Sequence, residues 1–223
     1  MIERLVQPAS SFAGDIDWLF TFVHLLVGFW FILVQGMFFY LLFRYRYREG
    51  VRTQYITGKE PHLKRWVNIP HILIIFCDVF VIIFAVQVWN HVKLDLPENH
   101  DATIRVIGQQ WAWSFVHPGE DGELDTEDDI KMVDELHVEE GKTYLFKLES
   151  RDVLHSFSVP VFRLKQDAVH GRVITGWFQP TTAGVYDIQC AEMCGIGHGI
   201  MGARIHVETA EDHSAWMASK KGS

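Results

Sequence analysis

Two long stretches of this 223-residue chain almost lack charged side chains. No Asp, Glu, Lys or Arg occurs from Trp18 to Phe43, and Asp78 is the only one from Val67 to Val92. Because about 20 apolar residues cross a bilayer, each 26-residue run is long enough to span a membrane. The pattern predicts two transmembrane helices, and the alternative is a pair of buried helices in a large soluble protein.

The first run also lacks the features of a cleaved signal peptide. The stretch before it is not basic, shows no small-residue cleavage site, and precedes a run too long for the apolar part of a signal sequence. We therefore expect both runs to remain as a multi-pass helical hairpin in contact with membrane lipid. Trp66 and Trp89 fall near the ends of the second run, where aromatic side chains favour the interface, and Pro70 is expected in its first turn, where proline is tolerated.

Charge divides the chain into two unlike parts. Residues 1–92 hold 8 Lys and Arg against 6 Asp and Glu, whereas residues 93–223 hold 12 against 22. Short loops rich in Lys and Arg stay on the cytoplasmic side of a membrane. The short loop between the apolar runs contains Arg44, Arg46, Arg48, Arg52, Lys59, Lys64 and Arg65. We thus expect the acidic part on the periplasmic side of a bacterial inner membrane, and no nucleic-acid partner.

These patterns predict four parts: an N-terminal segment (1–16), the transmembrane hairpin (17–92), a soluble domain (93–210) and a loosely ordered polar tail (211–223). In the soluble domain, short β-rich segments separated by Gly, Pro and Thr turns predict a sandwich or a barrel. The predicted strands are Thr103–Ile107, Lys142–Glu149, Arg172–Phe178, Val185–Gln189 and Ala203–Val207. Tyr144, Phe146 and Leu148 alternate with polar residues and are expected to face the core.

Cysteine is scarce, and two of the three cysteines fall in one glycine-rich segment. Cys190, Cys194, His198 and Met201 lie within twelve residues, and His155 lies 35 residues upstream. Thiol, imidazole and thioether groups are the soft and borderline ligands that favour copper. Three glycines at alternate positions predict a loop able to fold tightly around an ion. The third cysteine, Cys77, lies in the second apolar run and is expected to be core.

The ligand number distinguishes this segment from a mononuclear blue-copper site, which uses two His, one Cys and a weak axial Met. A second Cys would allow two thiolates to bridge two copper ions. Three alternatives remain at this point. They are a disulfide, which an outward-facing compartment permits, a structural zinc site, for which Met is a poor ligand, and ordinary core packing.

At these residues the sequence resembles subunit II of the haem-copper cytochrome c oxidases. The resemblance rests on the Cys-x3-Cys-x3-His-x2-Met motif and on Asp152-Val-Leu-His155-Ser. It implies a two-helix transmembrane hairpin followed by an all-β, cupredoxin-like Greek-key barrel that holds the dinuclear CuA centre. It also implies that the chain is an oxidoreductase subunit, which accepts electrons from cytochrome c for oxygen reduction and proton translocation elsewhere in the complex.

The resemblance further implies a role for each motif residue. Cys190 and Cys194 are the expected bridging thiolates, His155 and His198 the terminal ligands, and Met201 a weak axial ligand. Glu192 is expected to supply the other axial ligand through its carbonyl, and to reach a magnesium ion shared with subunit I. Trp111, in Gly108-Gln-Gln-Trp-Ala-Trp113, is the expected point of electron entry.

The resemblance also names partners. They are subunit I with its haem and CuB, subunit III, and a cytochrome c that is soluble or tethered. The chain carries no Cys-x-x-Cys-His haem motif, so the donor is expected to be a separate chain.

A quinol-oxidase subunit lacks these copper ligands, and nitrous oxide reductase needs a large further domain that we do not expect here. A nitric oxide reductase with a CuA subunit stays open, because its distinguishing chemistry would lie in the partner chain.

Three weaker signals remain. The acidic run 118–129 is interpreted as a solvated hairpin in preference to a calcium site, because it lacks the spacing of an EF-hand loop; its charge could also steer a basic donor. Asp78 is interpreted as hydrogen-bonded against a neighbouring subunit in preference to a functional carboxylate. The remaining histidines have no partner spacing and are expected to be surface or packing residues: His71, His91, His137, His206 and His213.

Overall fold

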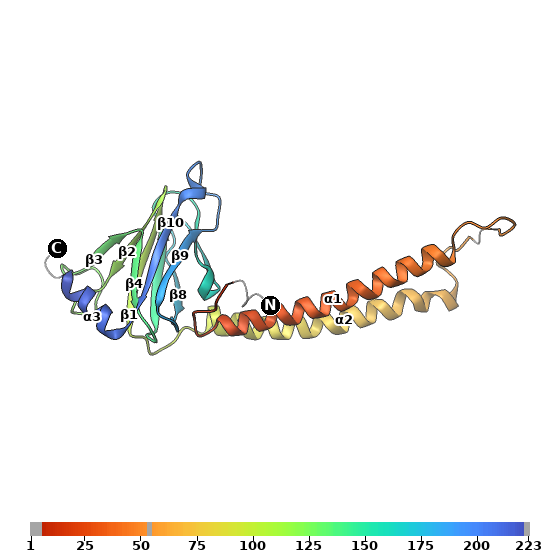
Figure 1. The fold of residues 1–223 in the computed structure, drawn as a ribbon, viewed down its shortest axis with the longest axis horizontal. Helices are drawn as coiled ribbons and strands as arrows, with labels where there is room; N and C mark the ends of the chain where they lie inside the picture. The colour runs from red at the N-terminus through yellow and green to blue at the C-terminus, as the bar shows by residue number, and fades with distance from the viewer. Residues whose placement is uncertain (1–5, 53–54, 221–223) are drawn as a thin grey trace. The chain divides into compact units, whose positions relative to one another are not determined.

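The computed structural model describes residues 6–52 and 55–220. Residues Trp18–Trp89 form one compact unit of two helices. The described residues before Trp18 and those from Asn90 onward form the second unit, which contains the β-strands (Figure 1).

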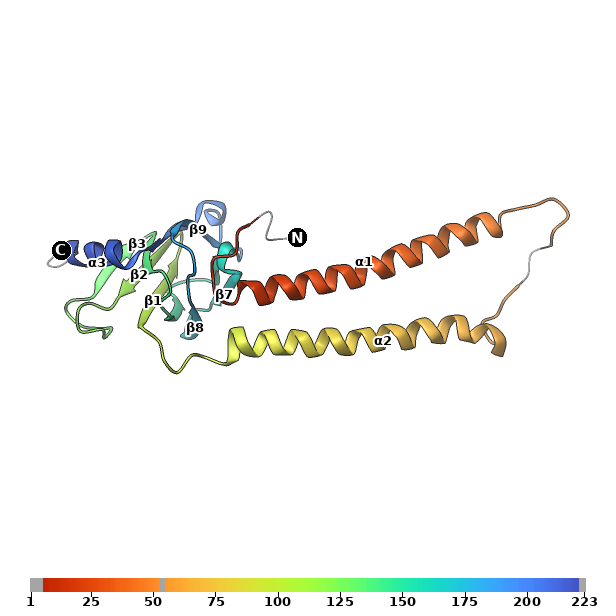
Figure 2. The ribbon, with the colours of Figure 1, turned by 60° about the horizontal axis from the view of Figure 1, so that its bottom comes forward.

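The first unit is a helical hairpin. Its helices are α1 (Ala13–Arg44) and α2 (Pro61–Trp89), and both are long and apolar enough to cross a membrane. They appear as two antiparallel rods in Figures 1 and 2, and the rings of Trp18 and Phe22 contact Phe84 between them, at 5.0 and 5.2 Å. The expectation for Pro70 was wrong. The helix starts earlier, with Pro61 in its first turn, and Pro70 lies inside it.

The second unit is a cupredoxin-like barrel of two five-stranded sheets. The first has the order β3-β2-β1-β5-β8 and the second the order β4-β10-β9-β6-β7. Their bounds are β1 Ala102–Gln109, β2 Ala112–His117, β3 Ile130–Val133, β4 Glu135–Glu139, β5 Tyr144–Ser150, β6 His155–Val159, β7 Leu164–Ala168, β8 Ile174–Phe178, β9 Gly184–Cys190 and β10 Gly202–Glu208. The pairs β1–β5 and β4–β10 are parallel, and the other named pairs are antiparallel. All five predicted strands are confirmed as β1, β5, β8, β9 and β10.

Aromatic side chains fill the space between the sheets. Trp113, Phe146 and Phe157 are fully buried, and Phe157 makes edge contacts with both of the others at 5.6–5.8 Å. The alternation predicted for β5 is confirmed, since Tyr144, Phe146 and Leu148 are buried while Lys147 is exposed. Period-two alternation places successive side chains on opposite faces of a strand, so this face of β5 is the core face.

The residues just before the hairpin belong to the barrel. Phe12 is fully buried, and its ring packs edge-on against Trp177 at 5.2 Å. The Arg163 guanidinium makes two hydrogen bonds to the Asp17 carboxylate, at 2.7 and 2.8 Å, and both side chains are almost inaccessible to solvent. A buried charge needs a partner of this kind, because an isolated one is very costly. Residues 9–17 thus complete the core of the barrel.

The chain after β10 differs from the expectation. A loosely ordered tail was predicted, and this was wrong for residues 210–219, which form α3 (Ala210–Ser219). The side chain of Thr209 accepts a hydrogen bond from the Asp212 amide at 3.2 Å, which caps the helix N-terminus. Helix α3 covers part of the outer face of β4 and β10, where Trp216 stacks on His137. The packing of the half-buried Trp216 ring on His137 and His213 explains why a polar segment is ordered.

The acidic segment 118–129 connects the antiparallel strands β2 and β3, so the predicted hairpin insertion is confirmed. Within it, the Asp128 carboxylate accepts hydrogen bonds from the Glu120 amide and the Thr126 hydroxyl, at 2.6 and 2.7 Å. Arg105 binds Asp125 through two hydrogen bonds of 2.7 Å. Asp128 is thus bound by groups of the loop itself, and Asp125 by Arg105 of the barrel.

Candidate metal centre

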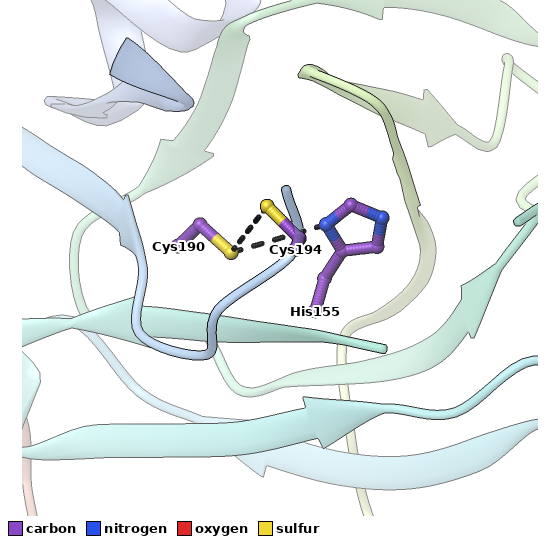
Figure 3. Close-up of side chains that lie close together, drawn as sticks. All are labelled: His155, Cys190 and Cys194. Atoms are coloured by element: carbon purple, nitrogen blue, oxygen red, sulfur yellow. Dashed lines mark hydrogen bonds between the residues drawn. The ribbon is translucent and has the colours of Figure 1, made fainter. Parts of the chain in front are cut away.

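Three strand ends and one loop bring the predicted ligands together. His155 begins β6, Cys190 ends β9, and Met201 immediately precedes β10. Strand β6 pairs with β9, with Phe157 opposite Cys190, so His155 lies near the end of β9. The loop 191–201 leaves β9 and returns to β10, its antiparallel neighbour, and carries the other ligands. Figure 3 shows His155, Cys190 and Cys194 pointing toward one another.

The donor atoms form a compact group, in which His155, Cys190, Cys194 and Met201 are buried. The Cys190 and Cys194 sulfurs lie 3.8 Å apart. The Cys190 sulfur lies 3.9 Å from Nδ1 of His155 and 3.2 Å from the carbonyl oxygen of Glu192. The Cys194 sulfur lies 3.7 Å from Nδ1 of His198 and 3.8 Å from the sulfur of Met201. Each thiol thus has one imidazole nitrogen and one further donor beside it.

A carboxylate fixes the orientation of the His155 ring. Asp152 accepts a hydrogen bond from Nε2 of His155 at 2.8 Å, and the imidazole is fully buried. With its proton on Nε2, the ring presents the Nδ1 lone pair toward Cys190. Metal-binding histidines commonly donate their other ring N–H to a carboxylate in this way. Asp152 also accepts a hydrogen bond from the Gln110 amide at 2.7 Å, which connects it to the segment carrying Trp111.

Trp111 lies directly against the ligand loop. Its indole N–H points to the Cys194 carbonyl at 3.4 Å, and the Gln110 side chain donates to the same oxygen at 2.8 Å. Gly197 is required at this place, because a Cβ there would lie 2.4 Å from the indole ring. Trp111 is 39% exposed. The indole therefore connects the protein surface to the backbone of a ligand residue.

The thiols are poised to bind a metal and do not form a disulfide. Both are free, and 3.8 Å is far longer than the 2.05 Å of an S–S bond. Burial, and after it the neighbouring Cys190, raises the pKa of the Cys194 thiol to about 11. At neutral pH the free thiol is protonated, so a bound metal must displace its proton. Two sulfurs, two imidazoles and a thioether fit copper better than zinc, for which Met is a poor ligand.

All the predicted copper ligands lie in this group. The side chain of Glu192 points to the neighbouring Met193 amide at 3.3 Å, while its carbonyl lies beside Cys190. The sequence did not single out Asp152 or Gln110, although Asp152 stands three residues before His155. It also gave no sign of a second group, Glu135, His137 and His206, whose ligand atoms lie within 4.8 Å of one another.

The fold and the site together define a class: a copper-binding protein with a cupredoxin-like barrel and two helices long enough to span a membrane. Comparison with known proteins gives the family. Residues 142–209 match the model for the periplasmic domain of cytochrome c oxidase subunit II. The alternative cytochrome c oxidase subunit 2 of Bradyrhizobium diazoefficiens is 32% identical over 237 aligned positions, covering 96% of this chain and 83% of that protein.

Other relatives agree. Cytochrome c oxidase subunit 2 of Cereibacter sphaeroides is 28% identical, with coverage of 97% of this chain and 80% of that protein. Among solved structures, the periplasmic domain of cytochrome oxidase subunit II from Bradyrhizobium japonicum matches with a TM-score of 0.50 and 29% identity. That match covers 56% of this chain and 97% of the solved chain. The chain belongs to the cytochrome c oxidase subunit 2 family, and is thus a subunit of a haem-copper oxidoreductase.

Proposed function

We propose that this chain holds a dinuclear copper centre through which electrons from a cytochrome c enter the oxidase and pass to haem in subunit I. The observation that carries the proposal is the pairing of donors: each of the two thiols has its own imidazole nitrogen, at 3.9 and 3.7 Å. When bound, two copper ions sharing the thiolates would accept and release one electron with little change in geometry. Cys190 and Cys194 would bridge, and His155 and His198 would bind one ion each.

The remaining donors would complete the two coordination shells. The Met201 sulfur and the Glu192 carbonyl lie beside different thiols, on Cys194 and Cys190 respectively. This supports their roles as two weak axial ligands. The Glu192 side chain is half-buried, and its carboxylate is the candidate ligand for a magnesium ion shared with subunit I.

Trp111 is the proposed entrance for the electron. Its ring is partly exposed, and its N–H points to the carbonyl of the ligand residue Cys194. Around this position the loop exposes apolar side chains, with Ile196 at 98% and Ile200 at 85%. An apolar patch of this kind is typical of a docking surface. The excess of acidic residues beyond residue 93 would attract a basic donor.

The location follows from the helices. We propose that α1 and α2 cross the inner membrane as a two-span anchor, with the barrel residues 93–210 on the periplasmic side. The basic loop between α1 and α2 supports this orientation. Subunit I, and also subunit III, would then contact the hairpin within the bilayer.

The dinuclear centre is tested by metal analysis and electron paramagnetic resonance of the full chain, purified in detergent and loaded with copper. Two copper ions per chain that share one unpaired electron are the expected result. A single copper, or zinc in its place, would contradict the dinuclear assignment.

Electron entry is tested in the assembled oxidase with two glycine variants of the same loop. In Gly197→Ala the new Cβ would press on the Trp111 ring, whereas the Cβ of Gly199→Ala meets nothing within 4 Å. We expect Gly197→Ala to slow the reduction of the copper centre by reduced cytochrome c in stopped-flow mixing, and Gly199→Ala to leave the rate unchanged. Equal rates for both variants, with copper content retained, would exclude entry through Trp111.

A further inference from the structure

The end of β10 remote from the copper loop carries a second group of histidine and glutamate side chains. The parallel register of β4 and β10 places His206 opposite His137 and Arg204 opposite Glu135. These residues occupy the outer face of the sheet, because the alternate residues Leu136 and Ile205 are fully buried in the core. Two histidines and a glutamate thus lie side by side on one surface of the barrel.

His137 lies between two flat rings. The His206 imidazole stacks on it at 4.4 Å with an interplanar angle of 3°. The indole of Trp216, from α3, stacks on it at 4.4 Å and 10°. Because His206 comes from the neighbouring strand and Trp216 from the covering helix, they pack on opposite faces of His137. The ring of His137 is thereby fixed, and its side chain is only 10% exposed.

A glutamate sets the tautomer of this ring. Nδ1 of His137 is hydrogen-bonded to one carboxylate oxygen of Glu208 at 2.7 Å, and Nδ1 of His213 to the other oxygen at 2.9 Å. A proton on Nδ1 of His137 leaves the lone pair on Nε2, which faces the Glu135 carboxylate at 3.9 Å. A carboxylate behind an imidazole whose other nitrogen is free is the arrangement that supports metal-binding histidines.

The other two side chains are available to a ligand. Nε2 of His206 is buried and has no hydrogen-bond partner among the residues that the structure describes. Arg204, opposite Glu135, pairs instead with Asp187 on β9. The Glu135 carboxylate is half exposed, so it leaves a path from solvent to the group.

We propose that Glu135, His137 and His206 form a binding site for a divalent transition ion of borderline softness, for which Zn²⁺ is the probe. Two imidazoles and one carboxylate are an established ligand set for zinc with an open fourth position. Their ligand atoms lie within 4.8 Å of one another, and a tetrahedral ion with ligands at about 2.1 Å would draw them closer. The planes of the stacked rings would tilt toward the ion, with His206 and the exposed Glu135 making most of the movement.

This site would differ from the copper centre in chemistry and in consequence. It contains no sulfur, so it favours a borderline ion over a soft one. An ion held here would cross-link the parallel strands β4 and β10 beneath α3. Binding to the folded state alone would raise the thermal stability of the barrel.

The test uses the full chain in detergent with the copper centre removed by Cys190→Ser and Cys194→Ser. Zn²⁺ is titrated against a chromophoric chelator, and we expect one zinc per chain. Glu135→Gln and His206→Gln are each expected to weaken zinc binding at least tenfold. Glu135 is exposed, so its substitution should leave the melting temperature of the metal-free chain unchanged. X-ray absorption of bound zinc should show imidazole and carboxylate ligands.

Two matched controls identify the site. Glu139→Gln changes the other glutamate on the same face of β4, and His100→Gln changes an exposed histidine outside the group; both should bind zinc as the parent does. Failure of the parent to bind zinc would overturn the proposal. It would equally be overturned if Glu135→Gln and His206→Gln bound zinc as tightly as the parent, or if Glu139→Gln lost binding to the same extent.

Discussion

The two ends of β10 carry two groups of potential metal ligands built in different ways. At the start of the strand, a glycine-rich loop folds back so that sulfurs and imidazoles converge from several directions on a buried point. At the other end, His137 and His206 project from paired positions of neighbouring strands, and their rings are parallel at 4.4 Å. The loop 191–201 would surround a bound ion with its ligands, whereas the paired strands β4 and β10 present their histidines side by side. The first geometry suits two copper ions, and the second needs its rings to tilt around one ion.

The two groups nevertheless share one device. In each, a carboxylate holds one nitrogen of a buried imidazole and leaves the other nitrogen free: Asp152 for His155 and Glu208 for His137. The carboxylates differ in their second role. Asp152 also binds the backbone of Gln110 beside Trp111, whereas Glu208 also binds His213 on α3. One group is thereby linked to the surface where electrons are proposed to enter, and the other to a covering helix.

The largest expected effect comes from removing one of the two thiols that are proposed to bridge the copper ions. Cys194→Ser should abolish the electron paramagnetic resonance signal of an electron shared by two coppers, because a single thiolate cannot form the double bridge. The matched control is Cys77→Ser. Cys77 is a free cysteine in α2, so its replacement should leave the signal unchanged. Zinc binding at Glu135, His137 and His206 should be the same in both variants. Persistence of the shared-electron signal in Cys194→Ser would exclude the bridging role.

A second prediction replaces each of the two supporting carboxylates, Asp152 and Glu208, by its amide. Asp152→Asn should weaken copper binding by about 10- to 100-fold, the usual effect of losing a partner behind a metal-binding histidine. Glu208→Gln should weaken zinc binding by a similar factor. Chelator competition on the full chain measures both affinities for each variant. If either substitution lowered both affinities equally, the effect would be a general loss of structure and not the loss of a local hydrogen bond.

A third prediction concerns acid sensitivity at the histidine end of the barrel. His117 is buried beside the ring of Trp216 at 5.1 Å. Burial, and after it the charges of His137 and His213, lowers the pKa of His117 to about 3. The unfolded chain, with an ordinary histidine pKa near 6.5, therefore binds this proton first, and stability falls as pH drops from about 6.5 toward 3.

The slope of this fall approaches about 1.4 kcal/mol per pH unit for one such group. It is measured from the free energy of unfolding of the metal-free chain in urea between pH 7 and pH 5, followed by tryptophan fluorescence. His117→Phe should reduce the slope by about that amount, because the substitute has no proton to bind. The same slope in parent and variant would show that another group controls acid unfolding.

The smallest effect is expected at the cap of α3. Thr209→Ala removes the side chain that accepts from the Asp212 amide, at a cost of about 1 kcal/mol in helix stability. Looser packing of Trp216 on His137 should slightly weaken zinc binding, whereas copper binding should not change. Urea unfolding and chelator competition measure the two effects. A change in copper affinity as large as that in zinc affinity would contradict the independence of the two ends of β10.

Several features were readable from the sequence because they depend on neighbours along the chain. The two apolar runs need only length and composition to predict their helices. Four copper ligands fall within one loop, so their spacing alone brings them near one another. Alternation in β5 identified its core face, and the acidic run 118–129 was correctly expected to be a solvated hairpin. The polar tail, by contrast, forms a helix, because Trp216 has a surface on which to pack.

The remaining features were decided by tertiary structure, because they join residues that are distant in the chain. Phe12 packs against Trp177, and Asp17 pairs with Arg163, which lies 146 positions away in the chain. The parallel register of β4 and β10 brings His137 to Glu208, 71 positions away. Pairing register depends on the packing of whole strands, and a shift of one residue would turn these side chains to the other face. The local sequence pattern thus determined the apolar helical hairpin and the loop of candidate copper ligands, whereas the register of β4 and β10 brought the histidine group together.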